Sequence, residues 1–532
     1  MEPKTLTRRT VLRTAALATG GYAVPFVHRA GAAEKIVPKG EMTLGWHTNI
    51  SPRWYDPLQH DGGATPDNFL MVCQDALIKN YKTKKYDHLA LADRFEFAAD
   101  ARSATFRLRE NIKFHDGSPV TPDDVKWSYE NYGGAWSRVL HDQTAKISII
   151  DKRTVKFEFK KPFLDFPRLI GTSNVCAAAW VVPANYYAKV GKEGYALKPI
   201  GAGPYKMVAQ EPGTKLVFEA FEDYYAPVHI KKFTIVSAPD AATRMAMIER
   251  GEADIVYGLP GELVARIKAN SKLMLAPVVS GNWWLQFPGF QDPKSPFHDK
   301  RVREAISLAI DRDAINQAEC AGLGVVDGNF INDDVEYALD WPKWPRDVAK
   351  AKKLMAEAGF PNGFQYDWLT PAPPYYSRGE RIMSQLQTTL GIRGKMQTVE
   401  RGVWNKRRQG GMKEWPGVNI MMAGARIGAT WANWYESLFK CGGQYAADAF
   451  CVKELDAKFE KYLESDKPAD RKRLAEEIQR EILENYYFVP VFRHAFMNAI
   501  GPRIAATKWQ EVFPTAGSTG YAYPWEEIKL KS

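Results

Sequence analysis

Side chains capable of catalysis or of holding a metal are present in this chain, but their spacing fits neither role. The sequence contains no HExxH, GxSxG or P-loop pattern. Its nine histidines show no spacing typical of metal ligands, and its five cysteines form no CxxC pair. Acidic pairs such as Asp123-Asp124 occupy adjacent positions, where the side chains point apart and suit helix caps better than acid–base catalysis. We therefore expect a protein that is not an enzyme and that has no metal site and no cofactor.

A glycine-rich turn at residues 201–205, with the sequence GAGPY, raises the question of a phosphate site. A GxG turn can bind phosphate when a helix begins directly after it. Here Pro204 follows the turn, and the spacing of a dinucleotide-binding motif is absent. The segment is therefore predicted to be a tight crossover of the backbone rather than a nucleotide site.

The first 32 residues have the composition of an export signal. Arg8 and Arg9 form a twin-arginine pair, Ala15 to Val27 is a weakly apolar run, and small residues around Ala32 fit a signal peptidase site. A membrane anchor is the alternative, but the run contains a proline and is shorter than the roughly 20 residues of a spanning helix. We expect residues 1–32 to be a twin-arginine signal peptide and the mature protein to be periplasmic.

The charge of the chain gives no indication of a nucleic acid partner. The net charge is +10, and residues 1–32 hold five Lys or Arg against one acidic residue, so the remaining chain carries +10 − 4 = +6. Basic residues are interleaved with acidic ones along the sequence instead of forming a basic stripe. We therefore expect a small molecule rather than a nucleic acid as the partner.

Periodicity and cap residues predict a mixed α/β chain. Arg94–Phe97 and Thr105–Arg109 alternate on either side of a turn and predict a β-hairpin. Thr121 is followed three residues later by an acid and predicts a capped helix. In the stretch 295–312, SPFHDKRVREAISLAIDR, Asp299 precedes apolar residues at three- and four-residue steps, which predicts an amphipathic helix. Further helices are predicted over 68–78, 347–359, 379–390 and most of 457–487.

Three of these segments resemble motifs of one known family. Residues 108–128 resemble LRxxxxFHDGxPxTxxDVxxS, residues 201–205 resemble GTGPY, and residues 296–312 resemble PFxDxRVRxAxxxAIDR. Weaker matches extend the similarity over about 91–492. The chain is thus similar to the peptide/nickel family (family 5, cluster C) of solute-binding proteins, the extracytoplasmic receptors of ABC importers.

The resemblance implies a fold and a mode of action. Such receptors have an α/β periplasmic-binding-protein type II clamp with two lobes and three domains, which closes over its ligand by hinge motion. By analogy, domain I would hold 34–75, 198–285 and 495–532, domain II 76–197, and domain III 286–494. The expected function is to capture a small organic solute and deliver it to an ABC permease in the inner membrane. We expect the receptor to be a monomer.

The resemblance also points to the kind of ligand. Peptide-binding relatives hold the ligand's ammonium with an Asp in a GWxADYxDP-like loop, and in the matching stretch 424–435 that position is Gly428. The stretch contains no acidic residue but does contain Arg426. Because a cleft that loses a carboxylate and gains a guanidinium favours an anion, we expect Arg426 to bind a carboxylate of the ligand. Arg378 is a second candidate, and the alternative for each is an interdomain or surface ion pair.

Aromatic side chains would complete such a cleft, since ligand sites combine apolar walls with a few polar groups. A single Trp more often belongs to a core, which is the alternative for each ring. The candidate wall residues, together with the polar residue that follows the first strand, are Trp46, Trp283, Trp284, Trp431, Trp434 and Asn49.

Two further questions stay open in the sequence. An oligopeptide ligand ranks behind a carboxylate-bearing organic acid, opine-like conjugate or modified peptide, and a nickel chelate ranks third. A sensory protein that presents its ligand to a chemoreceptor would use the same clamp.

Cys441 and Cys451 are spaced to close a local loop in an oxidising compartment, whereas Cys73, Cys176 and Cys320 are expected to be buried thiols.

Overall fold

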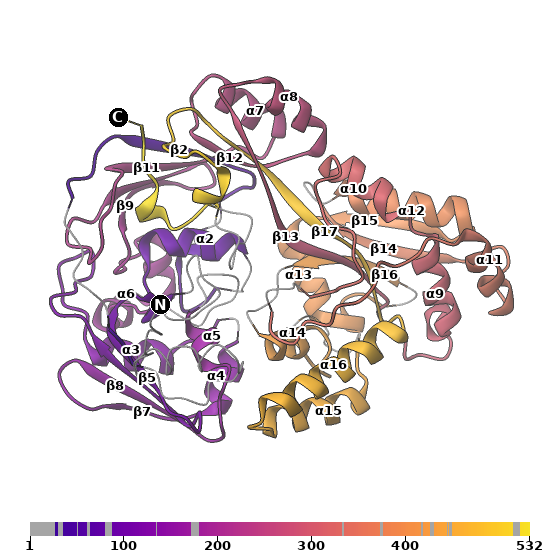
Figure 1. The fold of residues 1–532 in the computed structure, drawn as a ribbon, viewed down its shortest axis with the longest axis horizontal. Coiled ribbons are helices and arrows are strands. Elements are labelled where there is room, and N and C mark those ends of the chain that lie inside the picture. The colour runs from indigo at the N-terminus through magenta and orange to yellow at the C-terminus, as the bar shows by residue number, and fades with distance from the viewer. Residues whose placement is uncertain are drawn as a thin grey trace, which may run out of the picture.

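A computed structural model shows a mixed α/β molecule with two lobes that are joined by two long strands (Figure 1). Within the part of the chain that the structure describes, no helix is long and apolar enough to cross a membrane. The described residues are 27–29, 36–50, 52–60, 64–79, 88–134, 136–171, 180–331, 335–372, 376–416, 419–425, 430–443, 445, 450–513 and 522–531.

Among these residues, a ten-stranded sheet runs through both lobes in the order β15-β14-β16-β13-β17-β12-β2-β11-β10-β9. Its first-lobe strands are β2 (Glu41–Trp46), β9 (Tyr205–Glu211), β10 (Lys215–Ala220), β11 (Lys232–Ser237) and β12 (Ile255–Leu259). Its second-lobe strands are β14 (Gln365–Pro371), β15 (Arg393–Val399) and β16 (Asn419–Ala425). Parallel pairing of β2 with β11 and β12, and of β14 with β15 and β16, is typical of α/β folds.

The two lobes are connected through β13 (Met274–Gln286) and β17 (Phe488–Ile500), which pair antiparallel along their whole length. The chain enters the second lobe along β13 and returns along β17, as the crossing strands in Figure 1 show. Their register shifts between Val279 and Gly281 and again between Trp283 and Trp284. Such irregularities bend a strand and reorient its side chains.

The first lobe also contains a five-stranded sheet in the order β1-β5-β6-β8-β7. Residues 94–97 and 105–108 pair antiparallel within it, which confirms the predicted hairpin. Strand β1 lies inside the predicted signal peptide, so cleavage near residue 32 would remove it. The strands of this sheet and of a small two-stranded sheet are β1 (Val27–Arg29), β5 (Ala92–Phe97), β6 (Ser103–Leu108), β7 (Thr144–Ile149), β8 (Thr154–Phe159), β3 (Ile78–Lys79) and β4 (His88–Leu89).

Helices cover the sheets of both lobes (Figure 1). In the first lobe they are α2 (Ala64–Cys73), α3 (Pro122–Glu130), α4 (Ser137–Gln143), α5 (Phe166–Gly171), α6 (Ala184–Leu197), α7 (Ala241–Glu249) and α8 (Val264–Ala269). In the second lobe they are α9 (Lys300–Ala309), α10 (Arg312–Cys320), α11 (Val348–Glu357), α12 (Tyr376–Leu390), α13 (Arg401–Gly410), α14 (Trp431–Leu438), α15 (Lys453–Glu464) and α16 (Pro468–Glu484). Short 3₁₀ helices are η1 (Pro52–Tyr55), η2 (Gly261–Leu263), η3 (Pro296–His298), η4 (Gly411–Lys413), η5 (Trp509–Glu511) and η6 (Trp525–Glu527).

Two of the predicted caps form as expected. Asp299 accepts a hydrogen bond from the Arg301 amide at 2.8 Å and begins α9. Thr121 and Asp124 form a reciprocal capping box at the start of α3. The helix predicted over 68–78 is wrong at its second half, because α2 ends at Cys73 and the following residues pair with other segments instead.

The GAGPY turn packs against the end of α2, which explains its glycines. A Cβ atom on Gly201 would lie 2.0 Å from the Cys73 carbonyl oxygen, and one on Gly203 would lie 2.6 Å from the Cys73 carbonyl carbon. His115 links its own turn to this crossover, since Nδ1 accepts from the Gly201 amide and Nε2 lies 3.0 Å from the Gly203 carbonyl oxygen. The predicted crossover is therefore confirmed, and His115 has a structural role beside it.

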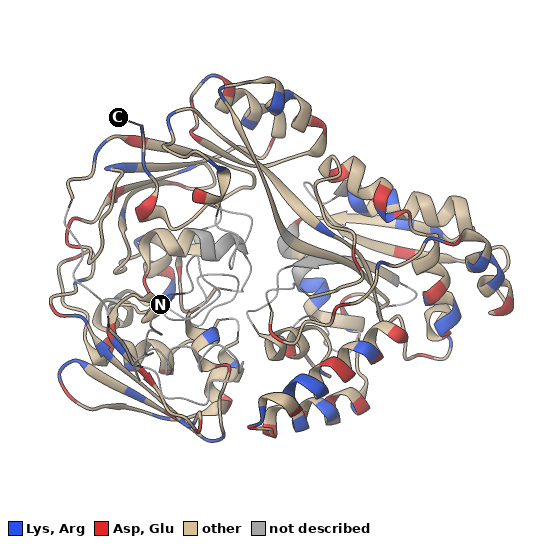
Figure 2. Cartoon of the chain, in the orientation of Figure 1, with Lys and Arg blue, Asp and Glu red and all other residues tan. Residues whose placement is uncertain are grey.

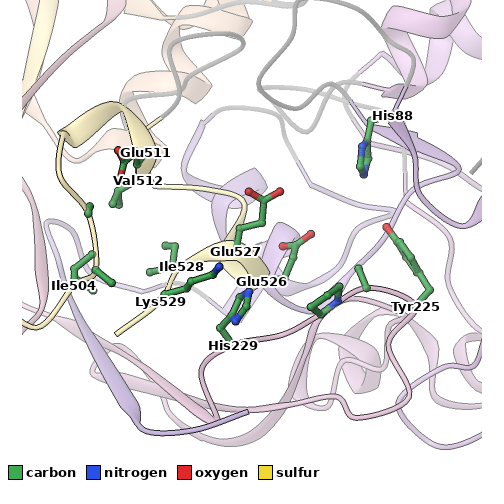
Figure 3. Close-up of a pocket in the computed structure, with 14 residues that line it drawn as sticks. His88, Tyr225, His229, Ile504, Glu511, Val512, Glu526, Glu527, Ile528 and Lys529 are labelled. Carbon is green, nitrogen blue, oxygen red and sulfur yellow. The ribbon is translucent and has the colours of Figure 1, made fainter. Parts of the chain in front are cut away.

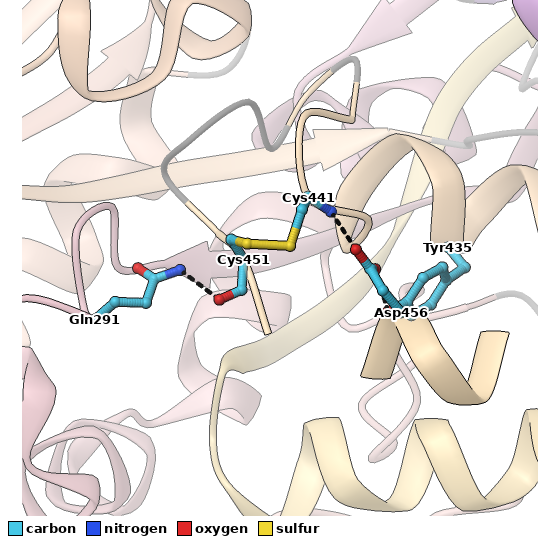
Figure 4. Close-up of a disulfide and its surroundings, with 5 residues drawn as sticks. All are labelled: Gln291, Tyr435, Cys441, Cys451 and Asp456. Carbon is cyan, nitrogen blue, oxygen red and sulfur yellow. Dashed lines mark hydrogen bonds between the residues drawn. A yellow bond between two sulfur atoms is a disulfide. The ribbon is translucent and has the colours of Figure 1, made fainter. Parts of the chain in front are cut away.

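Charged residues and cysteines follow the expectations from sequence. Lys and Arg are interspersed with Asp and Glu over both lobes (Figure 2). Cys441 and Cys451 form a disulfide at a sequence separation of 10, and the N–H of Cys441 donates to Asp456 beside it (Figure 4). Cys73 and Cys320 are buried free thiols, whereas Cys176 lies outside the described residues.

Candidate functional site

Two of the expected binding residues, Arg378 and Trp283, meet beside the strands that join the lobes. Arg378 lies near the start of α12 and is 4 % exposed. Its guanidinium carbon is 4.9 Å from the centre of the Trp283 ring, which projects from β13. At this distance a guanidinium is attracted to the face of the ring, so Trp283 fixes the plane of the Arg378 cation.

His494 of β17 is the nearest polar neighbour of Arg378. The Nη2 atom of Arg378 contacts Nε2 of His494, and because arginine only donates, Nε2 accepts and the ring proton lies on Nδ1. Burial, and secondly the Arg378 cation, lower the pKa of His494 well below its usual 6.5, so the imidazole is neutral. Nδ1 is buried and has no hydrogen-bond partner in the described part of the protein. His494 thus provides an N–H donor next to a guanidinium.

Glu319 of α10 balances part of the positive charge. It is 8 % exposed, and its carboxylate accepts from Arg381 Nε at 2.8 Å and from the Ser377 hydroxyl at 2.9 Å. The distance from the carboxylate to Arg378 Nε is longer, at 3.5 Å. One carboxylate therefore serves two guanidiniums and is bound more closely by Arg381 than by Arg378.

Arg378, His494 and Glu319 line a cavity of about 390 Å³ between the lobes. The second lobe and β17 contribute Glu319, Arg378 and His494, and the first lobe contributes the segments 239–241 and 258–262. The first-lobe wall is braced by Arg244, which is 1 % exposed and donates to four backbone carbonyls. The volume falls within the usual range for small-molecule sites, and the walls come from parts that a closing clamp brings together.

The other tryptophans expected in the cleft are fully buried in packed cores. In the first lobe the ring centres of Trp46 and Phe69 are 4.6 Å apart, and in the second lobe those of Trp284 and Trp434 are 6.2 Å apart. Trp431 is also 0 % exposed and packs against Tyr435. These four rings were candidates for the cleft wall, and their burial in this structure fits the alternative given for each of them, a place in the core.

Asn49 and Arg426 complete the expected set. Asn49 is exposed in the loop that follows β2. Arg426 lies outside the described residues, as do its neighbours up to residue 429. Sequence reasoning missed His494 and Glu319 as site residues, because a lone His in an alternating strand and a lone Glu in a helix look like ordinary structural positions. Only the fold brings them to Arg378.

Ion pairs join the lobes at a second place, away from the cavity. Arg471 of α16 donates to Asp165, just before α5, at 2.8 Å. Arg168 of α5 pairs with Glu336, and Lys161 lies 3.7 Å from Glu464 of α15. Each pair joins a first-lobe residue to a second-lobe residue, so the structure is that of a clamp whose lobes are in contact.

A second cavity, of about 500 Å³, lies within the first lobe (Figure 3). Its described lining includes Glu526, Glu527, Lys529 and His229, and all of these belong to one lobe. Lobe closure does not enclose this cavity, so we do not assign the captured solute to it. Across the described residues, no group of three or more His, Cys, Asp or Glu side chains is placed to hold a metal ion.

Comparison with known proteins agrees with this architecture. Residues 88–422 match the profile of bacterial extracellular solute-binding proteins, family 5, middle region. The chain is 27 % identical over 430 residues to the glutathione-binding protein GsiB of Escherichia coli, covering 77 % of this chain and 81 % of that protein. It is 26 % identical over 465 residues to GsiB of Salmonella typhi, covering 85 % and 88 % of the two chains.

Solved structures share the fold. The periplasmic binding protein DppA of Helicobacter pylori, in complex with the peptide STSA, superposes with a TM-score of 0.79 at 20 % identity and covers 93 % of this chain and 98 % of its own. AgaA of A. tumefaciens R10, in complex with agropinic acid, gives 0.76 at 23 % identity, with coverage of 93 % and 99 %.

The family profile spans more than half of the chain, and the structure has the two-lobed clamp of this family. Sequence and fold therefore indicate the same class of protein. Proteins of this class bind small solutes outside the cytoplasm, in the periplasm or the extracellular space, and work with an ABC permease rather than as enzymes. The chain belongs to the family 5 bacterial extracellular solute-binding proteins, which serve ABC importers.

Proposed function

We propose that this receptor captures a small organic solute that bears a carboxylate, and that Arg378 and His494 bind that carboxylate in the cavity between the lobes. The observation that carries the proposal is the placement of a buried guanidinium, fixed on the Trp283 ring, beside an imidazole whose Nδ1–H has no acceptor among the described residues. A carboxylate of the ligand would supply an acceptor at this place, since its oxygens accept hydrogen bonds from guanidinium and N–H donors.

Asp240 and Glu262 line the first-lobe wall of the cavity, so the preference for an anion applies to the end formed by Arg378 and His494. Glu319 is held by Arg381 and Ser377, so it compensates Arg378 only in part. A buried cation is stabilised by an anionic partner, so a ligand carboxylate would add a favourable charge pair at Arg378. Organic acids, opine-like conjugates and modified peptides all carry such a group. The relatives named for glutathione and agropinic acid are consistent with this choice.

Several finer points belong to the same proposal. Trp283 and Asn49 are the proposed further contacts from β13 and the loop after β2, and Arg426 is proposed as a second anchor from the loop before α14. We also propose export by the twin-arginine pathway, a monomeric receptor with no nucleic acid partner, and the three-domain division into 34–75, 198–285 and 495–532, then 76–197, then 286–494.

An oligopeptide is the second candidate, since its terminal carboxylate suits the same donors. The absence of an acidic residue in the sequence from 424 to 435 argues against it, because a peptide ammonium needs a counter-charge. A nickel chelate ranks below both. A sensory role would use the same site, and the presence of a permease and an ATPase gene next to the receptor gene favours transport.

Mass spectrometry of small molecules released on denaturing the purified protein tests the ligand class directly. We expect a compound with a carboxylate, and a compound without any anionic group would refute the proposal. Calorimetric titration of Arg378→Gln with that compound is expected to show a loss of affinity of about 10- to 100-fold, the value of a charge-assisted hydrogen bond. Arg346→Gln, which removes an exposed ion pair with Asp311 in the same lobe, is the control and should change affinity less than about twofold.

A further inference from the structure

Arg408 in α13 is buried among three aromatic rings in the second lobe. The residue is 2 % exposed. Its guanidinium carbon lies 4.6 Å from the ring centre of Tyr445, 5.3 Å from that of Trp404 and 5.7 Å from that of Trp284. These rings hold the cation by cation–π attraction but offer no hydrogen-bond acceptor at its edge.

The edge of Arg408 that usually binds an anion has no partner. Nε and Nη2 form the side of a guanidinium that receives two acceptors at once, as in the pairing of Arg503 with Asp254. In Arg408 both of these atoms are buried and make no hydrogen bond in the described part of the protein. A buried donor without an acceptor loses its hydrogen bonds to water and forms no new ones, which costs free energy of folding. Such donors are rare in folded proteins.

Other buried arginines of the same chain show what this edge normally does. Arg244 donates from Nε and Nη2 to the carbonyls of Tyr257 and Gly258. Arg303 donates from the same two atoms to the Asn485 carbonyl. Arg312 uses Nε for the Pro490 carbonyl and Nη2 for the Ser307 hydroxyl. Arg408 is as buried as these residues, but its Nε and Nη2 atoms have no acceptor from the described residues. We therefore expect an acceptor that is not part of the chain.

The charge of Arg408 is uncompensated as well. Burial lowers its pKa to about 10, so the guanidinium remains protonated at neutral pH. No carboxylate lies within ion-pair distance of it among the described residues. An acceptor that also carries a negative charge therefore fits this edge better than a water molecule does.

A small cavity lies beside Arg408 and sets the size of that acceptor. It has free space of about 10 Å³, which is room for one water-sized particle. Gln286 also lines it, and its side-chain oxygen has no hydrogen-bond partner in the described residues. If the amide is turned about, its NH₂ group becomes a further donor, because the two amide orientations differ little in shape. An organic acid or a polyatomic anion is too large for the space.

Two residues that line the cavity belong to the segment that the disulfide spans. Tyr445 and Phe450 line the cavity and lie between Cys441 and Cys451 in sequence. Figure 4 shows how Gln291, which donates to the Cys451 carbonyl at 3.2 Å, ties this loop to the segment after β13. An anion on Arg408 would therefore hold together α13, the end of β13 and the disulfide loop.

We propose that the cavity beside Arg408 binds a single monatomic anion, chloride, which accepts from Nε and Nη2 of Arg408. The site is separate from the cavity between the lobes and does not depend on the proposed ligand. Its role is to stabilise the second lobe.

Thermal unfolding in sodium chloride and in sodium gluconate at equal ionic strength tests the stabilising role. The melting temperature of the natural protein is expected to be about 2 to 4 °C higher in chloride, with an effect that saturates as a single site does. Arg408→Met is expected to unfold at the same temperature in both salts. Arg407→Gln, which changes the neighbouring partly exposed arginine, is the control and should keep the chloride effect. A chloride effect that persists in Arg408→Met would overturn the proposal.

Diffraction from crystals of the unaltered protein grown in sodium bromide tests the site without any variant. The expected result is an anomalous bromide peak within about 3.5 Å of Arg408 Nε and Nη2, because bromide occupies chloride sites and the bond lengths follow those of charge-assisted contacts. A water molecule in that position, with no anomalous signal, would show that the cavity is hydrated and that the anion site does not exist.

Discussion

The ion pair between Asp165 and Arg471 gives the sharpest test of how closure and affinity are linked. Arg471 is 3 % exposed, donates to Asp165 at 2.8 Å and also donates to the Tyr462 hydroxyl at 2.7 Å. Asp165 belongs to the first lobe, whereas Arg471 and Tyr462 belong to the second. When the lobes separate, Arg471 retains its hydrogen bond to the Tyr462 hydroxyl but not the one to Asp165. The bond to Asp165 therefore stabilises only the closed form.

The magnitude follows from the burial of the pair. A hydrogen bond to a buried charged group contributes about 1.5–3 kcal/mol, and replacing Asp165 with the isosteric Asn removes the charge while keeping the shape. Taking about 2 kcal/mol, the closed form is disfavoured about 30-fold relative to the open form. If the ligand binds the closed form and the unliganded protein is mostly open, its apparent dissociation constant rises by the same factor.

Isothermal titration with the compound released from the purified protein measures the effect. Asp165→Asn is expected to bind about 30-fold more weakly than the natural protein, with its unfolding temperature nearly unchanged. Lys161→Gln is the matched control, since its interlobe pair with Glu464 has both side chains more than half exposed. Such a pair contributes little, so the control should stay within about twofold. Equal affinities for Asp165→Asn and Lys161→Gln would refute the idea that the buried pair stabilises closure.

Two further predictions concern stability. Replacing both Cys441 and Cys451 by Ser is expected to lower the free energy of unfolding of the second lobe by about 2.7 kcal/mol, since the bond closes a loop of sequence separation 10; urea unfolding that shows no loss would contradict this. Burial lowers the pKa of His115 from 6.5 to about 4, so below pH 6.5 the unfolded chain binds a proton that the folded chain does not. Stability should therefore fall as the pH falls from 6.5 to about 4, by at most about 3 kcal/mol, and His115→Gln should reduce this slope in urea titrations at several pH values.

The sequence predicted the local parts of the fold well, because they depend on short-range physics. The caps at Thr121 and Asp299 and the hairpin of β5 and β6 all depend on residues only a few positions apart. The helix expected over 68–78 failed in its second half, where Ala76 bridges to Trp180 and Ile78 pairs with Leu89. Pairing with distant segments overrode the local helical pattern there, and a single sequence does not reveal such partners.

The candidate site was predicted only in part, for a similar reason. Arg378 stood out in the sequence through resemblance, but its partners Glu319 and His494 lie 59 and 116 positions away, since 378 − 319 = 59 and 494 − 378 = 116. The adjacent rings of Trp283 and Trp284 were equally good candidates in sequence, and a strand must turn them to opposite faces. Only the structure shows that Trp283 contacts Arg378 while Trp284 packs into the core.

The position of this pair of rings connects ligand binding with the motion of the lobes. Trp283 and His494 lie on β13 and β17, the two strands through which the lobes are joined, and a register shift separates Trp283 from Trp284. In the proposed binding mode, a carboxylate on Arg378 and His494 contacts the connecting strands themselves, and the segments 239–241 and 258–262 of the first lobe line the same cavity in this structure. If the ligand contacts those segments in the closed form alone, binding must favour closure by the free energy that these contacts contribute. The same reasoning explains why the Asp165–Arg471 pair, on the far side of the interface, should change affinity without touching the ligand.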